Sequence, residues 1–213
     1  PTMKKPLTLF CVATAAALQA LTLDWATDNH SQAIAAGEDF SIVTTYTPGE
    51  TTTAAGWTTL VSISAYDASG SLIDDVLRAQ YQPGDSEITV YGNINDNFSR
   101  TIGTIVTAAN ETMRIIVNKE GNTVSVYANG QSVLTFDIDQ YIFGDVASYQ
   151  VFWSNQGELP GTIGDSGTYD DALTDWEIGE VSNPDVHPQA IPEPTALALL
   201  ALGVAAVALR RRA

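Results

Sequence analysis

Hydrophobic and polar residues alternate along much of the chain, most clearly over residues 57–66. Val61 and Ile63 fall on one face of an extended strand there, whereas Leu60 and Ser62 fall on the other. Because successive side chains of a strand point to opposite faces, the pattern predicts a strand with one buried face. Other stretches rich in β-branched and aromatic residues predict further strands. They cover residues 21–25, 40–46, 73–82, 87–91, 101–106 and 149–153.

Residues 113–136 predict three successive strands joined by two tight turns. The turns lie at residues 120–122 and 129–130, where Gly and Asn tolerate positive φ angles. Alternation in the second and third strands places one set of apolar side chains inward. This set is Val124, Val126, Ala128, Leu134 and Phe136. Residues 26–39 are polar and predict a loop, and no helical periodicity of useful length appears outside the two ends of the chain.

A predicted strand ends in Asn129-Gly130, and two candidate closing segments follow it near the end of the domain, at residues 169–173 and 176–181. This arrangement resembles the laminin-G-like, concanavalin-type jelly roll. The resemblance implies an all-β fold, a two-sheet antiparallel β-sandwich over residues 21–182. A signal helix would precede this sandwich, and a short transmembrane helix would follow it.

The N-terminus has the pattern of an export signal. Lys4 and Lys5 form a positive region, and residues 6–18 are mostly apolar. Ala20 is a small residue at which cleavage can occur, and Ala17 is a second candidate. We therefore expect residues 1–20 to be a signal peptide that is read by the secretion machinery. Cys11, the only cysteine, would leave with it, so the exported chain would have no disulfide.

The C-terminus has three parts in a fixed order, after a Pro-containing linker at residues 183–190. They are the stiff triplet Pro192, Glu193 and Pro194, the apolar run 196–209, and the positive stop Arg210, Arg211 and Arg212. This order resembles the PEP-CTERM sorting signal over residues 191–213. The resemblance implies recognition by an exosortase-type transpeptidase in a Gram-negative-type bacterium. The protein would be inserted in the membrane before processing and then reach the cell envelope or extracellular matrix.

A permanent membrane anchor is the alternative for this tail. The apolar run has 14 residues, and a helix of that length spans about 21 Å, against about 30 Å of hydrocarbon. This length is short for permanent residence and sufficient for a transient stop. We therefore favour sorting and processing over anchoring.

Charge narrows the range of partners. Residues 21–190 keep four basic and 24 acidic residues, a formal charge of −20. Nucleic acid is excluded as a partner, because a phosphate backbone requires a basic footprint. An acidic surface suits a dispersed exported protein, or one that collects divalent cations.

The sequence has few candidates for catalysis. It contains no Gly-rich phosphate loop and no zinc-ligand spacing, and its two histidines, His30 and His187, lie in a predicted loop and the linker. Asp175 and Glu177 are two residues apart and would share one face of a predicted strand. Paired carboxylates can cleave glycosides, and the spacing is similar to that of jelly-roll β-glucanases. A solvated strand face is the simpler interpretation, and we expect no enzyme.

Two further sets of residues are candidate binding sites. A predicted long loop, residues 155–171, contains several glycines and acids, and Asp165, Asp170 and Asp171 could hold calcium. An exposed acidic loop is the alternative. Tyr149, Trp153 and Tyr169 could stack against a sugar, although core packing is the alternative for Trp153.

These patterns together predict a non-enzymatic surface or matrix protein that binds polysaccharide or another surface component. Two alternatives remain. One is a structural matrix protein without a specific ligand, and the other is a glycoside hydrolase that uses Asp175 and Glu177.

Overall fold

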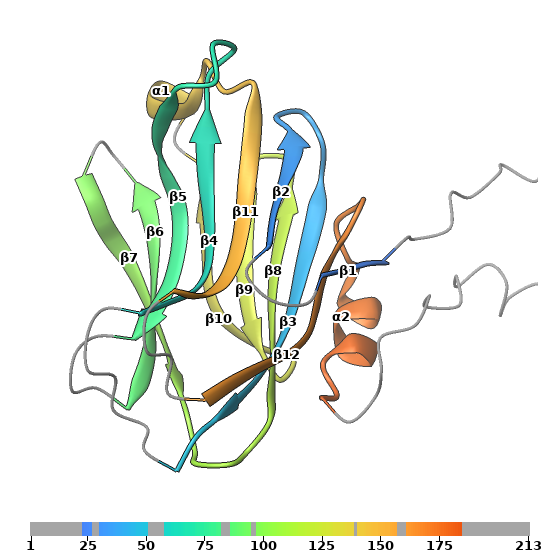
Figure 1. The fold of residues 1–213 in the computed structure, drawn as a ribbon. Helices are drawn as coiled ribbons and strands as arrows, with labels where there is room; N and C mark the ends of the chain where they lie inside the picture. The colour runs from blue at the N-terminus through green and yellow to red at the C-terminus, as the bar shows by residue number, and fades with distance from the viewer. Residues whose placement is uncertain are drawn as a thin grey trace, which may run out of the picture.

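The computed structural model describes residues 23–26, 30–50, 58–81, 86–94, 97–138, 140–156 and 161–184. These residues form two six-stranded antiparallel sheets, stacked as a sandwich (Figure 1). The all-β, two-sheet prediction is therefore confirmed. The expected signal peptide and the sorting segment lie outside these residues. Within them, no helix has the length and apolar character needed to cross a bilayer.

The first sheet, which we call sheet A, has the strand order β1-β12-β3-β8-β9-β10. Its strands are β1 (Leu23–Ala26), β12 (Gly161–Tyr169), β3 (Phe40–Pro48), β8 (Met113–Glu120), β9 (Thr123–Ala128) and β10 (Gln131–Asp137). The predicted meander of residues 113–136 is confirmed as β8, β9 and β10. Asn129 and Gly130 join the last two strands with φ angles of 47° and 79°. Two successive positive φ angles define the hairpin turn that Asn-Gly favours.

The second sheet, sheet B, has the order β2-β11-β4-β5-β6-β7. Its strands are β2 (His30–Ala35), β11 (Ser148–Gln156), β4 (Thr58–Tyr66), β5 (Leu72–Tyr81), β6 (Glu87–Ile94) and β7 (Asn97–Val106). The chain crosses between the sheets several times, so strands distant in sequence become neighbours (Figure 1). Two short helices complete the described elements, α1 (Gln140–Phe143) and α2 (Asp175–Val181).

The main core lies between the two sheets. Val61 and Ile63 of β4 are 1% exposed, and Val124 and Val126 of β9 are fully buried, as alternation predicts. Leu60 differs from the prediction, because it is also fully buried in this core. The pairing of β4 with β5 shifts register between Thr59 and Val61. Such a shift breaks the period of two, so Leu60 no longer follows the outward-facing series.

Three sequence predictions about local structure are wrong. Residues 26–39 contain β2, residues 155–171 contain β12, and residues 175–181 form helix α2 instead of a strand. Both added strands pair with others of their sheet, β12 with β1 and β3 and β2 with β11. Such long-range hydrogen bonds override the weak local preferences of polar and Gly-rich segments. Helix α2 begins where Thr174 caps its first turn.

Sheet A is packed on both faces. Helix α2 packs against residues of β3, β8 and β12 and covers a second, smaller cluster on the outer face of sheet A. Its members are Val43, Ile116, Tyr169, Leu173, Ile178 and Val181. Seven consecutive residues of β8, starting at Met113, are buried as a result. The outer face of sheet B instead carries a series of polar side chains.

Candidate binding face

The outer face of sheet B carries polar side chains across four neighbouring strands. Cross-strand pairing places Ser62 beside Phe152 and Arg78, and Ser64 beside Gln150 and Asp75. Directly paired residues point to the same side of a sheet. Pairing of β5 with β6 extends the series. We call this set the polar face: Ser62, Ser64, Asp75, Arg78, Gln80, Thr89, Tyr91 and Gln150.

Small hydroxyl residues form the centre of the polar face. Ser62 is 8% exposed and Ser64 is 5% exposed, whereas Arg78, Tyr91 and Gln150 at their sides are only half-buried. These serines alternate with the core residues of β4, so the strand that supports the sandwich core also supports this face. Because these serines are buried, they support the half-buried side chains of Asp75, Arg78 and Gln150, which are the ones that reach solvent.

A charged pair lies beside these serines. Arg78 and Asp75 form an ion pair, and Ser64 Oγ donates a hydrogen bond to Asp75 Oδ1. Both charged side chains keep some contact with solvent, at 34% exposure for Arg78 and 15% for Asp75. The guanidinium offers several donors, and the carboxylate and hydroxyl offer acceptors. This combination suits a ligand that is rich in hydroxyl groups.

Sequence reasoning missed this pair, because residues three apart on a regular strand point to opposite faces. The β4–β5 pairing shifts register between Ile63 and Ser64, which lets Asp75 and Arg78 share a face. The available signal was the presence of Arg78, one of four basic residues between positions 21 and 190. Its partner could not be named without the register.

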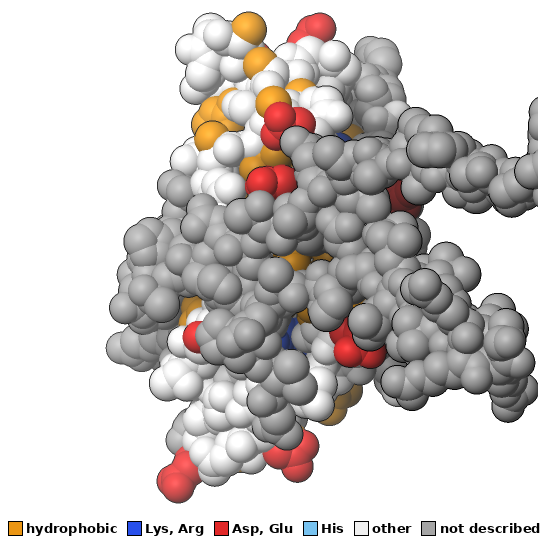
Figure 2. Space-filling view, turned by 90° about the vertical axis from the view of Figure 1, so that its right-hand side faces the viewer, with side chains coloured by type: hydrophobic (Ala, Val, Ile, Leu, Met, Phe, Trp, Pro, Cys, Tyr) orange, Lys and Arg blue, Asp and Glu red, His pale blue; other side chains and the backbone are white. Residues whose placement is uncertain are grey.

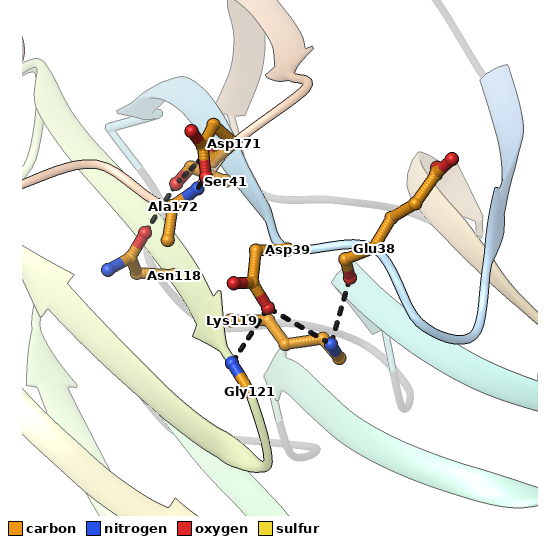
Figure 3. A network of polar contacts seen from close by, with 8 residues as sticks. All are labelled: Glu38, Asp39, Ser41, Asn118, Lys119, Gly121, Asp171 and Ala172. Carbon is orange, nitrogen blue, oxygen red and sulfur yellow. Dashed lines mark hydrogen bonds and ion pairs between the residues drawn. The ribbon is translucent and has the colours of Figure 1, made fainter.

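A second polar network joins the turn before β3 to β8 of sheet A (Figure 3). Lys119 is 3% exposed, and its Nζ donates to the carbonyl of Glu38 at 2.9 Å. The same Nζ lies 3.6 Å from Asp39 Oδ1, which also accepts from the backbone N–H of Gly121 at 2.7 Å. Burial lowers the pKa of Lys119, and Asp39 partly opposes this shift. The network has a structural role, because its donors and acceptors are used within the protein.

Tyr149 belongs to this buried region and does not form a sugar-stacking surface. Its side chain is 5% exposed, and Lys119 Nζ lies 5.4 Å from its ring centroid. Its ring also packs against that of Phe40, with centroids 6.1 Å apart. Burial raises the pKa of the Tyr149 hydroxyl. The side chain of Trp153 lies outside the described residues.

Tyr169 is also buried and offers no face to a sugar. It lies in the cluster beneath α2 and is fully buried. Burial raises the pKa of Tyr169 to about 12, and the nearby Arg114 opposes this shift. Arg114 itself is 1% exposed, and its Nη2 donates to the carbonyl of Pro184 at 3.4 Å. These residues hold the end of the sandwich domain against sheet A.

The proposed calcium ligands do not come together. Asp165 lies within β12, whereas Asp170 and Asp171 follow the end of that strand and are exposed. Asp171 Oδ1 accepts from the backbone N–H of Ala172 at 2.8 Å. Among the described residues, no group of three His, Cys, Asp or Glu side chains is placed to hold a metal ion. Figure 2 shows acidic side chains at several separate places on one side of the molecule.

Asp175 and Glu177 were an alternative carboxylate pair on a predicted strand, and the structure contradicts that strand. Both residues lie in the first turn of α2, so they do not share a strand face. Glu177 is 5% exposed, and its Oε2 accepts from the N–H of Thr174 at 2.8 Å and from its hydroxyl at 2.7 Å. This reciprocal arrangement is a capping box, which satisfies backbone donors at a helix start. Glu177 is therefore a structural residue.

Comparison with known proteins identifies the C-terminal segment. Residues 190–212 match the model of the PEP-CTERM protein-sorting motif. The protein is thus an exported bacterial β-sandwich protein that carries a sorting signal, processed at the cell envelope. The motif is recognised by exosortase, as the triplet of Pro192, Glu193 and Pro194 predicted. No curated protein matches the chain.

Solved structures with a similar arrangement include a family 7 alginate lyase, at 11% identity and a TM-score of 0.46, covering 63% of this chain and 60% of that one. The ligand-binding domain of botulinum neurotoxin serotype D, in complex with N-acetylneuraminic acid, is 13% identical to this chain, with a TM-score of 0.48. This match covers 76% of this chain and 43% of that one. The CBM40 domain of Ruminococcus gnavus IT-sialidase is 16% identical, with a TM-score of 0.45, and the match covers 68% of this chain and 83% of that one. The chain spans less than two thirds of the lyase. All three TM-scores are below 0.5, so the fold rests on the strand pairing itself.

Proposed function

We propose that this protein is a non-enzymatic surface or matrix protein that binds polysaccharide across the polar face of sheet B. The observation that carries the proposal is the contrast between the two outer faces of the sandwich. Sheet A has an apolar outer cluster beneath α2, whereas sheet B has serines beside the Asp75–Arg78 pair. A few polar groups beside aromatic side chains, here Phe152 and Tyr91 on the same face, are typical of ligand sites.

The chemistry of the polar face supports a sugar ligand. Arg78 can donate to hydroxyl oxygens, and the half-buried Asp75 and Gln150 can accept from hydroxyl hydrogens. Tyr91 is the cross-strand partner of Arg78 and adds an aromatic ring to the same face. Aromatic rings with polar neighbours are frequent in ligand contacts because they offer a large area at a low entropy cost.

Binding without cleavage is favoured because two of the candidate carboxylates, Asp75 and Glu177, already have partners within the protein. Asp75 already accepts from Ser64 and Arg78, and Glu177 caps α2. Hydrolysis of a glycoside by the common route uses two carboxyl groups on either side of the bond. The acids that sequence reasoning offered for that role lie on α2, away from the polar face.

A glycan-binding screen of the exported chain, purified in mild detergent, tests the proposal. We expect saturable binding that Arg78→Ala weakens at least tenfold, since hydrogen bonds from charged groups are worth about 1.5–3 kcal/mol. Ser125→Ala is the control, because Ser125 lies on β9 of sheet A. The screen is run with calcium and with chelator, because calcium dependence remains a prediction.

Each outcome has a defined meaning. Equal affinity of the Arg78→Ala variant would remove the polar face from the proposal. Absence of binding to every glycan would favour a structural matrix protein without a specific ligand. Release of reducing ends from any glycan would show that the protein is an enzyme.

A further inference from the structure

β7 is an edge strand that exposes large apolar side chains. It ends sheet B and is 10 residues long, against four for β1, six for β2 and seven for β10, the other edge strands. Ile102 is 60% exposed and Val106 is 74% exposed. Both side chains point to the same face of the sheet, because their positions in the strand differ by four, an even number.

The edge of sheet A shows what a protected edge looks like in the same molecule. β10 exposes Gln131, Ser132, Thr135 and Asp137, and its pairing with β9 shifts register between Ser132 and Leu134. Polar and charged side chains, short length and bulges are the devices that stop edge strands from pairing with other chains. β7 is not short, and over residues 102–106 Thr104 is its only polar side chain.

We propose that two copies of this protein pair through β7, with the strands antiparallel and a two-fold axis at Thr104. This register places Ile102 of one copy beside Val106 of the other, so both apolar pairs match. Thr104 then faces its own equivalent, a pairing that is favourable across strands. A shift of the axis by one residue loses this match, since Ile102 would then face Thr104 or Ala108. The self-complementary sequence is the reason to choose a second copy as the partner.

Charge favours the same edge. Residues 21–190 have a formal charge of −20, so two copies repel at most parts of their surfaces. β7 contains one charged residue, Arg100, which is basic. The acid nearest by register on the outer face is Glu87, the β6 partner of Val106. Pairing through β7 therefore brings together a part of the surface with little negative charge, and salt screens the rest beyond about 8 Å.

The pairing has a consequence for binding. A two-fold axis perpendicular to the sheet leaves the outer faces of both copies on the same side. The two copies of sheet B would join into one continuous sheet, with two polar faces exposed together. A long polysaccharide could then contact both faces, which raises its apparent affinity through effective concentration.

Disulfide trapping tests the register. Thr104→Cys is introduced together with Cys11→Ser, which removes the other cysteine of the chain. We expect the exported Thr104→Cys chain to form a covalent dimer that a reductant reverses. Thr135→Cys in the same background is the matched control, because Thr135 is an exposed threonine on the edge strand β10.

A second pair of substitutions tests the apolar contact. Ile102→Lys with Val106→Lys should weaken the dimer at least tenfold in sedimentation experiments while each chain keeps its β circular dichroism spectrum, because both side chains are exposed in the single chain. A Thr104→Cys chain that stays monomeric under oxidation would refute the pairing. The proposal also fails if Thr135→Cys crosslinks equally well, or if the double-lysine chain dimerises as before.

Discussion

Asn118 on β8 holds the backbone of Leu173 through both of its polar side-chain atoms. Its Nδ2 donates to the carbonyl of Leu173 at 3.0 Å, and its Oδ1 accepts from the N–H of Leu173 at 2.8 Å. Ser41 on β3 adds a hydrogen bond to Asn118 Oδ1, and its Oγ accepts from the same N–H at 2.9 Å. Figure 3 shows Ser41, Asn118 and Asp171 side by side. One side-chain amide thus acts as a strand partner and fixes the segment that leads into α2.

Asn118→Ala should lower the free energy of unfolding by about 2 kcal/mol, because it leaves the buried carbonyl of Leu173 without this donor. Urea denaturation of the purified chain measures the change. Asn122→Ala is the matched control, since Asn122 is exposed in the β8–β9 turn and should change stability little. Equal effects of the two substitutions would contradict the role assigned to Asn118.

Thr174→Ala should destabilise the protein by about 1 kcal/mol, the usual cost of removing a helix N-cap. Thr174 and Glu177 cap each other reciprocally at the start of α2. Glu180→Ala provides the comparison, because Glu180 is exposed on the same helix. Thermal unfolding measures both. If Thr174→Ala were no more harmful than Glu180→Ala, α2 would not depend on its capping box.

Gly92→Ala and Gly179→Ala should have opposite effects on stability. A Cβ at Gly92 would lie 2.7 Å from the ring of Phe136, a side chain of the main core, whereas a Cβ at Gly179 would meet nothing within 4 Å. Overpacking should cost about 1–3 kcal/mol at Gly92. Alanine within helix α2 should stabilise by about 0.5–1 kcal/mol at Gly179. Denaturation midpoints of the two variants decide this, and a Gly92→Ala variant as stable as the natural chain would show that β6 and β10 approach differently.

The carboxylate of Asp67 should make stability depend on pH in acid. Hydrogen bonds, first from the Ser69 hydroxyl and then from the backbone of Ser71, lower the pKa of Asp67 below its ordinary 3.8. The folded state therefore binds this proton less readily than the unfolded state. Its contribution to stability is complete above pH 3.8 and is lost as the pH falls through the lowered value.

NMR titration of the Asp67 carboxyl measures the shift directly. The difference in stability between the natural chain and Asp67→Asn should shrink as the pH falls below 3.8. A difference that stayed constant with pH would show that the turn does not depend on the charge of Asp67.

Several features were predictable because they depend on local sequence. Alternation in β4 and β9 predicted which side chains reach the core, since a strand places every second residue on one face. Asn129-Gly130 predicted a hairpin turn because few residues adopt two positive φ angles in succession. The sorting motif was also predictable, because an enzyme reads it as a linear segment.

The candidate binding face was not predictable, because it depends on register. Asp75 and Arg78 share a face only through a shift in the β4–β5 pairing, and the same strand pair buries Leu60. Tyr149 and Tyr169 resembled ligand-binding aromatics in sequence but are buried by strands and a helix from distant parts of the chain.

That this is an exported, acidic β protein with a sorting signal follows from composition, hydrophobic alternation and short motifs, which are properties of local sequence. Which face of which sheet is polar, and which edge is open, follows only from the folded arrangement. Those properties depend on strand order, register shifts and the packing of α2 on sheet A, which are set by contacts between residues far apart in the chain.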